Sequence, residues 1–159
     1  MNGALDELYR EVILDHHRRP RGREPLPGPA DLRAEGKNPS CGDELTLELA
    51  CNQGAIAGTH VDCRGCAIAT ASGSILAELL VGRTPEQARA LAEAFREAMH
   101  SPDGALPDEL DPGDLEVLTG VRKFPARVKC ALLPWITLLS ALDAPGGGAA
   151  APATTEGGA

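Results

Sequence analysis

Four residues place the strongest constraint on how this chain can fold: Cys41, Asp43, Cys66 and Cys130. Three thiolates and one carboxylate are enough to hold a single zinc ion tetrahedrally. Cys41 and Asp43 are two residues apart, so in extended backbone both side chains project to the same side. Cys66 and Cys130 would have to arrive from distant segments. Spacing alone does not establish that convergence, because the chain lacks the paired Cys-x-x-Cys knuckles of common zinc sites.

Four ordered motifs carry this pattern along the chain. They are LYREVILDHHRRPR at residues 8–21, NPSCGD at 38–43, GCAIATAS at 65–72 and FPARVKCALLPW at 124–135. Together they resemble the SufU branch of the IscU/NifU-like family of iron–sulfur cluster assembly proteins, up to about residue 143. The resemblance is closer to SufU than to the IscU scaffolds. Lys129 stands where those scaffolds carry a histidine, and a long insertion separates Cys66 from Cys130.

The resemblance implies a function and a site. It implies a zinc-dependent sulfurtransferase that accepts persulfide sulfur from a SufS-type cysteine desulfurase and passes it towards the iron–sulfur assembly machinery. The implied zinc ligands are Cys41, Asp43, Cys66 and Cys130, and Arg127 would orient the partner or the persulfide. Two alternatives stay open: a scaffold that holds a transient iron–sulfur cluster, and a purely structural zinc domain.

Cys41 is the expected sulfur acceptor, because an acceptor has to leave the metal and reach a partner's active site. It is followed by Gly42 in a loop flanked by proline, which can move at little backbone cost. Cys66 and Cys130 are expected at helix N-termini, where the helix dipole stabilises a thiolate but the backbone is anchored.

Composition and length predict one domain over residues 1–143, followed by a disordered low-complexity tail over 144–159 rich in Gly, Ala, Pro and Thr. An apolar run of about 18 residues is missing, and the N-terminus lacks the order of a signal peptide. We therefore expect a cytoplasmic protein that does not insert in a membrane. In that reducing compartment, the 5 cysteines are better explained as ligands, reactive thiols or core residues than as disulfides.

The charge distribution argues against a nucleic-acid partner. The net charge is −8, with 15 Lys and Arg against 23 Asp and Glu. Positive charge is local, and one basic cluster, Arg122, Lys123, Arg127 and Lys129, comes just before Cys130. Cations there would offset the excess negative charge of the ligands and favour thiolate over thiol.

The hydrophobic patterns predict an α+β fold, with a small antiparallel sheet packed with helices. Alternation predicts strands at 44–51 and 55–63 joined as a hairpin, after an irregular surface segment at 20–39. Helical spacing predicts helices at about 4–18, 66–81, 85–99, 112–120 and 130–142. The helix at 85 has a capping box in Thr84 and Gln87, with Pro85 at its first position.

Two further cysteines and two histidines lie outside this set of candidate ligands. Cys51 shares the apolar face of the first strand, so we expect it in the core. Cys63 forms a Cys-x-x-Cys with Cys66 directly before a helix, which leaves redox chemistry or a spare ligand open beside a bystander role. His16 and His17 are expected simply to close the first helix, where a cation suits the dipole.

Overall fold

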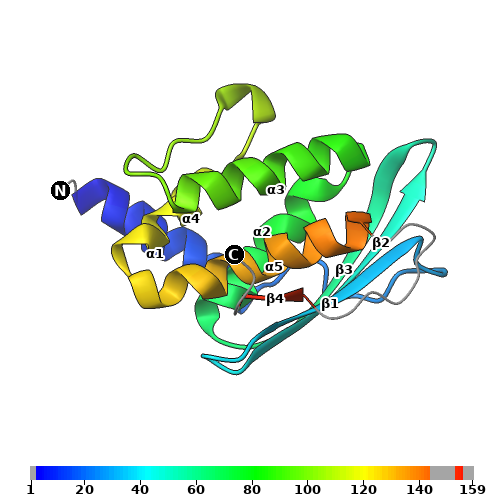
Figure 1. The fold of residues 1–159 in the computed structure, drawn as a ribbon, viewed down its shortest axis with the longest axis horizontal. Helices are drawn as coiled ribbons and strands as arrows, with labels where there is room; N and C mark the ends of the chain where they lie inside the picture. The colour runs from blue at the N-terminus through cyan, green and yellow to red at the C-terminus, as the bar shows by residue number, and fades with distance from the viewer. Residues whose placement is uncertain (1–2, 144–152, 156–159) are drawn as a thin grey trace.

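The computed structural model describes residues 3–143 and 153–155. Within them a four-stranded sheet, in the order β3-β2-β1-β4, is covered by helices on one side (Figure 1). The strands are β1 (Leu32–Asn38), β2 (Asp43–Asn52), β3 (Ala55–Arg64) and β4 (Ala153–Thr154). The first three pair antiparallel, whereas β4 lies parallel to β1. The predicted α+β class is therefore confirmed.

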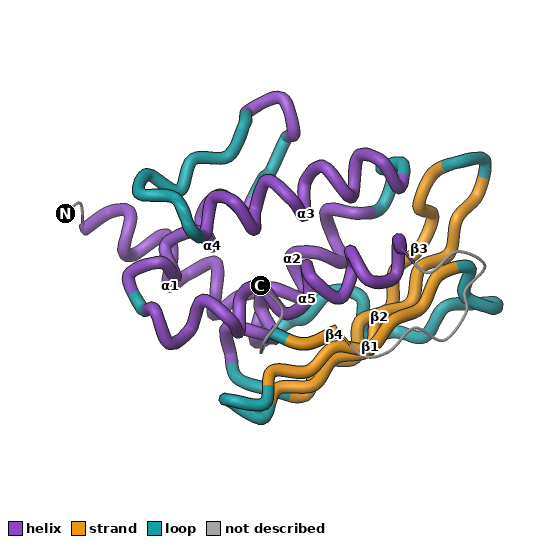
Figure 2. The backbone as a smooth tube through the Cα atoms, viewed as in Figure 1, coloured by secondary structure: helices purple, strands orange, loops and turns teal. Residues whose placement is uncertain are grey.

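The helices form two layers above the sheet (Figure 2). They are α1 (Gly3–Arg18), α2 (Ala67–Leu80), α3 (Pro85–Met99), α4 (Asp114–Leu118) and α5 (Pro125–Asp143), with 3-10 turns at Asp108–Leu110 and Thr119–Lys123. α5 packs on β1 and β2, and α2 packs on β3. α1 then covers α2, and α3 covers α5. The hydrophobic core lies between these layers.

The predicted hairpin is confirmed as β2 and β3. Leu45, Leu47 and Leu49 alternate towards the helices and are buried, as the sequence pattern requires. At the turn, Gln53 and Gly54 both adopt positive φ, 54° and 81°, which is the backbone geometry that matches the twist of a tight hairpin. The pairing places Cys63 opposite Leu45.

Two helix starts follow their predicted chemistry. Cys66 is the N-cap of α2, and its Sγ accepts a hydrogen bond from the Ala69 N–H at 3.5 Å. The capping box of α3 is present in full: Thr84 Oγ1 accepts from Gln87 N, and the Gln87 side chain accepts from Thr84 N. The local sequence was sufficient to predict where both helices begin.

Two boundaries differ from prediction. The segment predicted to be irregular at 20–39 contains β1, and the final helix begins at Pro125 instead of about residue 130. Proline suits the first helical position, so Pro125 can start the helix. Pro134 then lies inside it and cannot donate to the carbonyl of Cys130. Ser72 Oγ donates to the neighbouring Ala131 carbonyl at 2.6 Å, so a second helix supports the turn that proline weakens.

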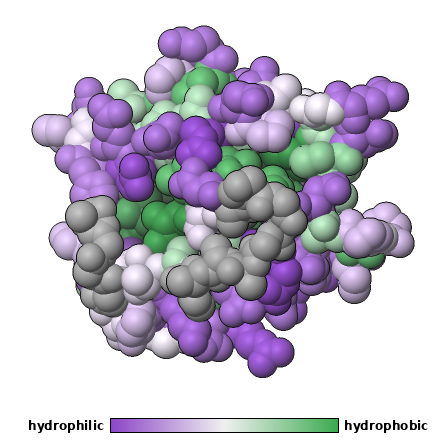
Figure 3. Space-filling model, turned by 45° about the vertical axis from the view of Figure 1, so that its right-hand side comes forward, coloured by the Kyte–Doolittle hydropathy of each residue, from purple (hydrophilic) through white to green (hydrophobic). Residues whose placement is uncertain are grey.

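The described part of the chain has one helix long and apolar enough to cross a membrane, α5, with 19 residues. Its apolar side chains face the core: Leu133, Trp135 and Leu138 are fully buried between the sheet and α3. Hydrophilic residues dominate the rim of the face in Figure 3, and hydrophobic residues gather near its middle. α5 is thus a core helix of this fold.

The predicted disorder of residues 144–159 lies largely outside the described residues. Residues 153–155 are described, and Ala153 and Thr154 form β4 beside β1. Low-complexity composition does not prevent such pairing, because the bonds at a sheet edge use backbone groups that every residue but proline offers.

Candidate metal centre

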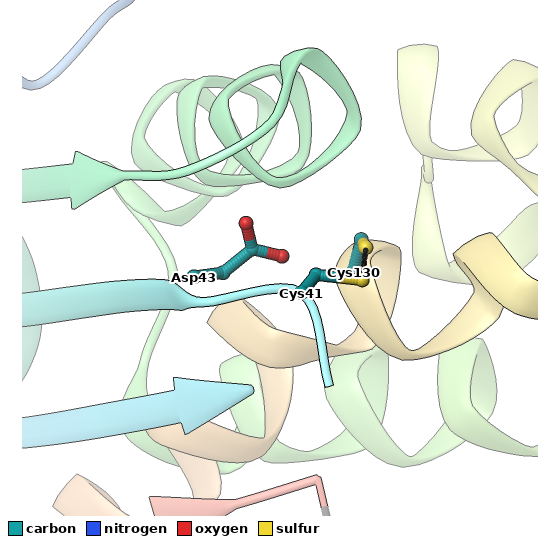
Figure 4. A group of neighbouring side chains, drawn as sticks. All are labelled: Cys41, Asp43 and Cys130. Atoms are coloured by element: carbon teal, nitrogen blue, oxygen red, sulfur yellow. Dashed lines mark hydrogen bonds between the residues drawn. The ribbon is translucent and has the colours of Figure 1, made fainter. Parts of the chain in front are cut away.

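Cys41, Asp43 and Cys130 meet at one end of the sheet, and their ligand atoms all lie within 4.8 Å of one another. Cys41 lies in the turn between β1 and β2, Asp43 begins β2, and Cys130 comes from α5 (Figure 4). Residues 89 apart in the chain are in contact here, since Cys130 Sγ donates to Cys41 Sγ at 3.5 Å. The predicted approach of these three residues is therefore present in the fold.

The turn gives Cys41 and Asp43 opposite environments. The N–H groups of Cys41 and Gly42 both donate to the Asn38 carbonyl, at 3.2 and 2.9 Å, and Gly42 has a φ of 74°. The expectation of extended backbone at this pair is therefore wrong: a left-handed glycine turns the chain between them. Cys41 ends up exposed, whereas Asp43 is buried.

The carboxylate of Asp43 is held from two sides. Its Oδ1 accepts from the Cys66 N–H at 2.9 Å, and its Oδ2 accepts from Asn38 Nδ2 at 3.3 Å. In Figure 4 the carboxylate points towards the segment that leads into α2. Gly65 leaves the space for it, because a Cβ there would lie 2.4 Å from Oδ1. The helix N-terminus that follows favours this negative charge.

Cys66 lies next to this group but is not one of its three members. Its Sγ lies 3.9 Å from Asp43 Oδ2. The side chain is half-buried and already serves as the N-cap of α2. A third thiol, and fourth candidate ligand, is thus beside the carboxylate, at the helix start where the sequence predicted it.

Cys130 is the buried thiol of the group. It lies in the second turn of α5, so its predicted place at a helix N-terminus is wrong, because the helix starts at Pro125. Burial raises the pKa of Cys130, and hydrogen bonds with Cys41, Asp43 and Cys66 raise it further. A bound cation would oppose this preference for the neutral thiol, because metal ligation deprotonates sulfur.

Arg127 lies in the first turn of α5, three residues before Cys130, and is exposed. A hydrogen bond with Cys130 raises the pKa of the guanidinium, and the charges of Cys66, Cys130 and Cys41 act in the same direction. The structure therefore places a permanent cation at the solvent edge of the thiols. This placement agrees with the basic flank predicted before Cys130.

Asn38 belongs to the site and was not singled out by sequence reasoning. It is fully buried, and its Nδ2 donates to Asp43 Oδ2 at 3.3 Å and to Cys130 Sγ at 3.5 Å. The signal was an asparagine directly before Pro-Ser-Cys, at the end of a strand, where an inward position would normally be apolar. Its amide links the two ligands that are most buried.

The other cysteines lie apart from this group. Cys63 is buried in the core opposite Leu45, and burial raises its pKa to about 11. Cys51 is half-buried at the far end of β2, and burial raises its pKa as well. Cys51 packs against the core, as predicted. The surroundings of Cys63 are those of a core residue, and its role stays a prediction.

His16 does more than close α1, which was the expectation from the sequence. It is fully buried, with Nδ1 2.7 Å from Ser74 Oγ and Nε2 2.9 Å from Asp114 Oδ2. It therefore joins α1 to α2 and α4. Glu78 completes a second group of potential ligands with His16 and Asp114, but it pairs with Arg21 at 3.3 Å. Both ring nitrogens of His16 already have partners, so we assign this network to packing.

The first group fits zinc by its donor types and spacing. Tetrahedral zinc places two thiolate sulfurs about 3.8 Å apart, and a sulfur and a carboxylate oxygen about 3.6 Å apart. The sulfurs of Cys41 and Cys130 are 3.5 Å apart, and Cys66 Sγ is 3.9 Å from Asp43 Oδ2, so each distance is within about 0.3 Å of the value for zinc. Buried supporting bonds from Asn38 and the Cys66 N–H orient the ligands, as metal sites require.

Residues 8–131 match the family model of the NifU-like N-terminal domain. The chain therefore belongs to the NifU-like N-terminal domain family, which confirms the resemblance seen in the motifs.

Named relatives add detail to this assignment. The chain is 36% identical to the zinc-dependent sulfurtransferase SufU of Bacillus subtilis over 137 residues, 86% of this chain and 90% of that protein. It is equally 36% identical to the iron–sulfur cluster assembly scaffold protein IscU of Streptococcus pyogenes, over 87% of this chain and 84% of that one. A crystal structure of a SUF-system scaffold protein from Fervidobacterium islandicum superposes with a TM-score of 0.75 at 32% identity, covering 83% of this chain and 94% of that chain.

Proposed function

We propose that this protein is a zinc-dependent sulfurtransferase of the cytoplasm, which accepts persulfide sulfur from a SufS-type cysteine desulfurase and supplies iron–sulfur cluster assembly. One observation carries the proposal: an exposed thiol, Cys41, lies on a glycine turn 3.5 Å from the buried thiol of Cys130. The likeness to the Bacillus sulfurtransferase supports the same reaction.

The proposed ligands are Cys41, Asp43, Cys66 and Cys130. When bound there, zinc would keep the thiols deprotonated at neutral pH. Asp43 and Cys130 are the fixed side of the site, because each is buried and bonded to Asn38. Cys41 is the mobile side, because it is exposed and precedes a glycine in a turn.

The transfer step follows from this asymmetry. The Cys41 thiolate attacks the outer sulfur of the persulfide on the desulfurase cysteine. A sulfur–sulfur bond forms on Cys41, the original one breaks, and the desulfurase cysteine departs as a thiolate. Arg127, at the solvent edge of the thiols, would attract the anionic persulfide and orient it towards Cys41.

The test is to incubate the protein with desulfurase and cysteine, trap thiols by alkylation and locate the persulfide by mass spectrometry. We expect the extra sulfur on Cys41 and none in Cys41→Ser. Cys51→Ser is the matched control, because Cys51 lies at the far end of β2 and should leave transfer unchanged. Persulfide on Cys66 or Cys130, with Cys41 unmodified, would show that the acceptor is misassigned.

A scaffold function is the second candidate, favoured by the 36% identity to scaffold proteins. The same four residues would then hold a nascent cluster. Lys129 counts against it, because a lysine replaces the histidine expected there as a further ligand. Metal content and absorption after purification without added metal separate the two. Colourless zinc supports transfer, whereas brown iron with sulfide supports the scaffold. A purely structural zinc site fits less well, because Cys41 is exposed.

A further inference from the structure

The short strand β4 reaches the metal centre from outside the residues that define the family. The family match ends at residue 131, and β4 begins at Ala153. Gly36 pairs with Ala153 and Lys37 with Thr154, and the Thr155 N–H donates to the Lys37 carbonyl at 3.2 Å. α5, which carries Cys130, also packs against β4. The pairing therefore brings Thr155 alongside Asn38, the last residue of β1.

Thr155 makes a side-chain bond at this point. Its Oγ1 donates to Asn38 Oδ1 at 2.9 Å. The hydroxyl lies half-buried, and Asn38 is fully buried. The bond therefore occurs where water competes little, and it occupies the acceptor end of the amide.

An amide has two unlike ends, and Thr155 binds the oxygen end, which leaves the nitrogen end for the ligands. With Oδ1 turned to Thr155, Nδ2 faces Asp43 Oδ2 and Cys130 Sγ, at 3.3 and 3.5 Å. The reversed amide would present its oxygen to a carboxylate and a thiolate, which are acceptors only. The donor end also offsets negative charge that collects on the ligands.

We propose that Thr155 is a positioning residue of the metal centre: its hydroxyl fixes the Asn38 amide so that the amide donates to Asp43 and Cys130. The C-terminal strand is then part of the site and steadies the two buried ligands while Cys41 stays free to move. This inference rests on the proposed function only in requiring that the site holds zinc.

The experiment uses the full-length zinc-loaded protein and measures the rate of zinc transfer to a chromogenic chelator. Thr155→Val keeps the shape and removes the hydroxyl, and we expect release about fivefold faster, the factor for one neutral hydrogen bond. Thr155→Ser restores a hydroxyl and should release zinc at the wild-type rate. Thr154→Val, the exposed neighbour in β4, is the matched control and should also match wild type.

A second readout separates positioning from general stability. Cobalt-loaded Thr155→Val should show altered thiolate-to-metal absorption bands, because Cys130 and Asp43 lose their fixed donor. In an Asn38→Leu background, Thr155→Val should have no further effect on zinc release, since the amide it acts through is gone.

Three outcomes would overturn the inference: unchanged release from Thr155→Val, equal acceleration by Thr154→Val, or full additivity with Asn38→Leu. The second would show that strand pairing alone matters. A wild-type protein that fails to retain zinc would instead refute the proposed function, so the two failures are distinguishable.

Discussion

At the scale of single residues, burial sets the chemistry of the thiols. Cys41 is exposed on a turn, whereas Cys63 lies in the core although a Cys-x-x-Cys spacing joins it to Cys66. Burial raises the pKa of Cys63 to about 11. A thiol in these surroundings is a poor nucleophile, because the thiolate is the reactive form. The same motif on an exposed loop would have favoured redox chemistry.

We therefore predict that Cys63 is a bystander. At pH 8 only about one molecule in a thousand carries the Cys63 thiolate, given a pKa near 11. Brief alkylation of the native, zinc-free protein should modify Cys41 and spare Cys63, as read by peptide mass spectrometry. Cys63→Ser should keep both zinc occupancy and desulfurase stimulation. Lost activity with zinc still bound would indicate a resolving thiol instead.

The same residue predicts a pH dependence of stability. Its pKa is raised on folding, so the unfolded chain releases this proton more readily. The stability that the neutral Cys63 thiol contributes is fully present below the pKa of cysteine in the unfolded chain, about 8.5. It is lost as the pH rises through the folded-state pKa of about 11. Urea unfolding at pH 8 and pH 10.5 should show a smaller loss of stability in Cys63→Ala than in wild type. An equal loss would contradict the assignment.

At the scale of elements, the junction of β3 and α2 builds one wall of the metal centre. Gly65 leaves room for the Asp43 carboxylate, and the next residue, Cys66, donates its N–H to it. A side chain at residue 65 would enter the carboxylate's place. This junction is therefore shaped by a contact with a strand start more than twenty residues earlier.

We predict that Gly65→Ala weakens zinc binding by roughly 10- to 100-fold, the range for changes in the support of a ligand. The added Cβ would lie 2.4 Å from Asp43 Oδ1, so the carboxylate has to shift. Chelator competition measures the affinity. Gly28→Ala is the control, because a Cβ there meets no atom within 4 Å. Equal affinities for the two variants would contradict this account of Gly65.

At the scale of the molecule, zinc would join elements that are otherwise held together by packing and a few hydrogen bonds. The turn and strand start at residues 41–43, the start of α2 and the interior of α5 supply the proposed ligands, and one ion would hold all three segments. Ligation would thereby link the sheet to both helices that cover it. A metal ion that binds the folded protein and not the unfolded chain stabilises the fold by its free energy of binding.

We predict that chelation lowers the melting temperature by roughly 10 °C, since ligand binding worth a few kcal/mol shifts a domain of this size by that order. Calorimetry before and after zinc removal checks this. Asp43→Ala should show a smaller effect of zinc, because three ligands would remain. Cys51→Ser should behave as wild type. An unchanged melting curve after verified zinc loss would mean that the metal does not stabilise the fold.

Local chemistry was enough to predict several elements from sequence. Thr84, Pro85 and Gln87 start α3, and the alternation of Leu45, Leu47 and Leu49 predicts β2. These features act over a few residues, so neighbouring side chains determine them. The candidate ligands were likewise recognisable from residue type and motif. Their three-residue core, Cys41, Asp43 and Cys130, is present in the fold, whereas the metal itself stays a proposal.

Tertiary structure decided what depends on distant contacts. β1 was not predictable, because its buried positions are Ala34, Gly36 and Asn38, which do not form a run of large apolar residues. Gly36 is small because α5 packs closely against it: a Cβ at this position would lie 2.0 Å from Thr137 Oγ1. Asn38 is polar because it hydrogen-bonds to the candidate ligands. The approach of Cys130 to Cys41 and the bond from Thr155 to Asn38 also join residues 89 and 117 apart. Such contacts form only when the helices pack on the sheet, so no local pattern specifies them.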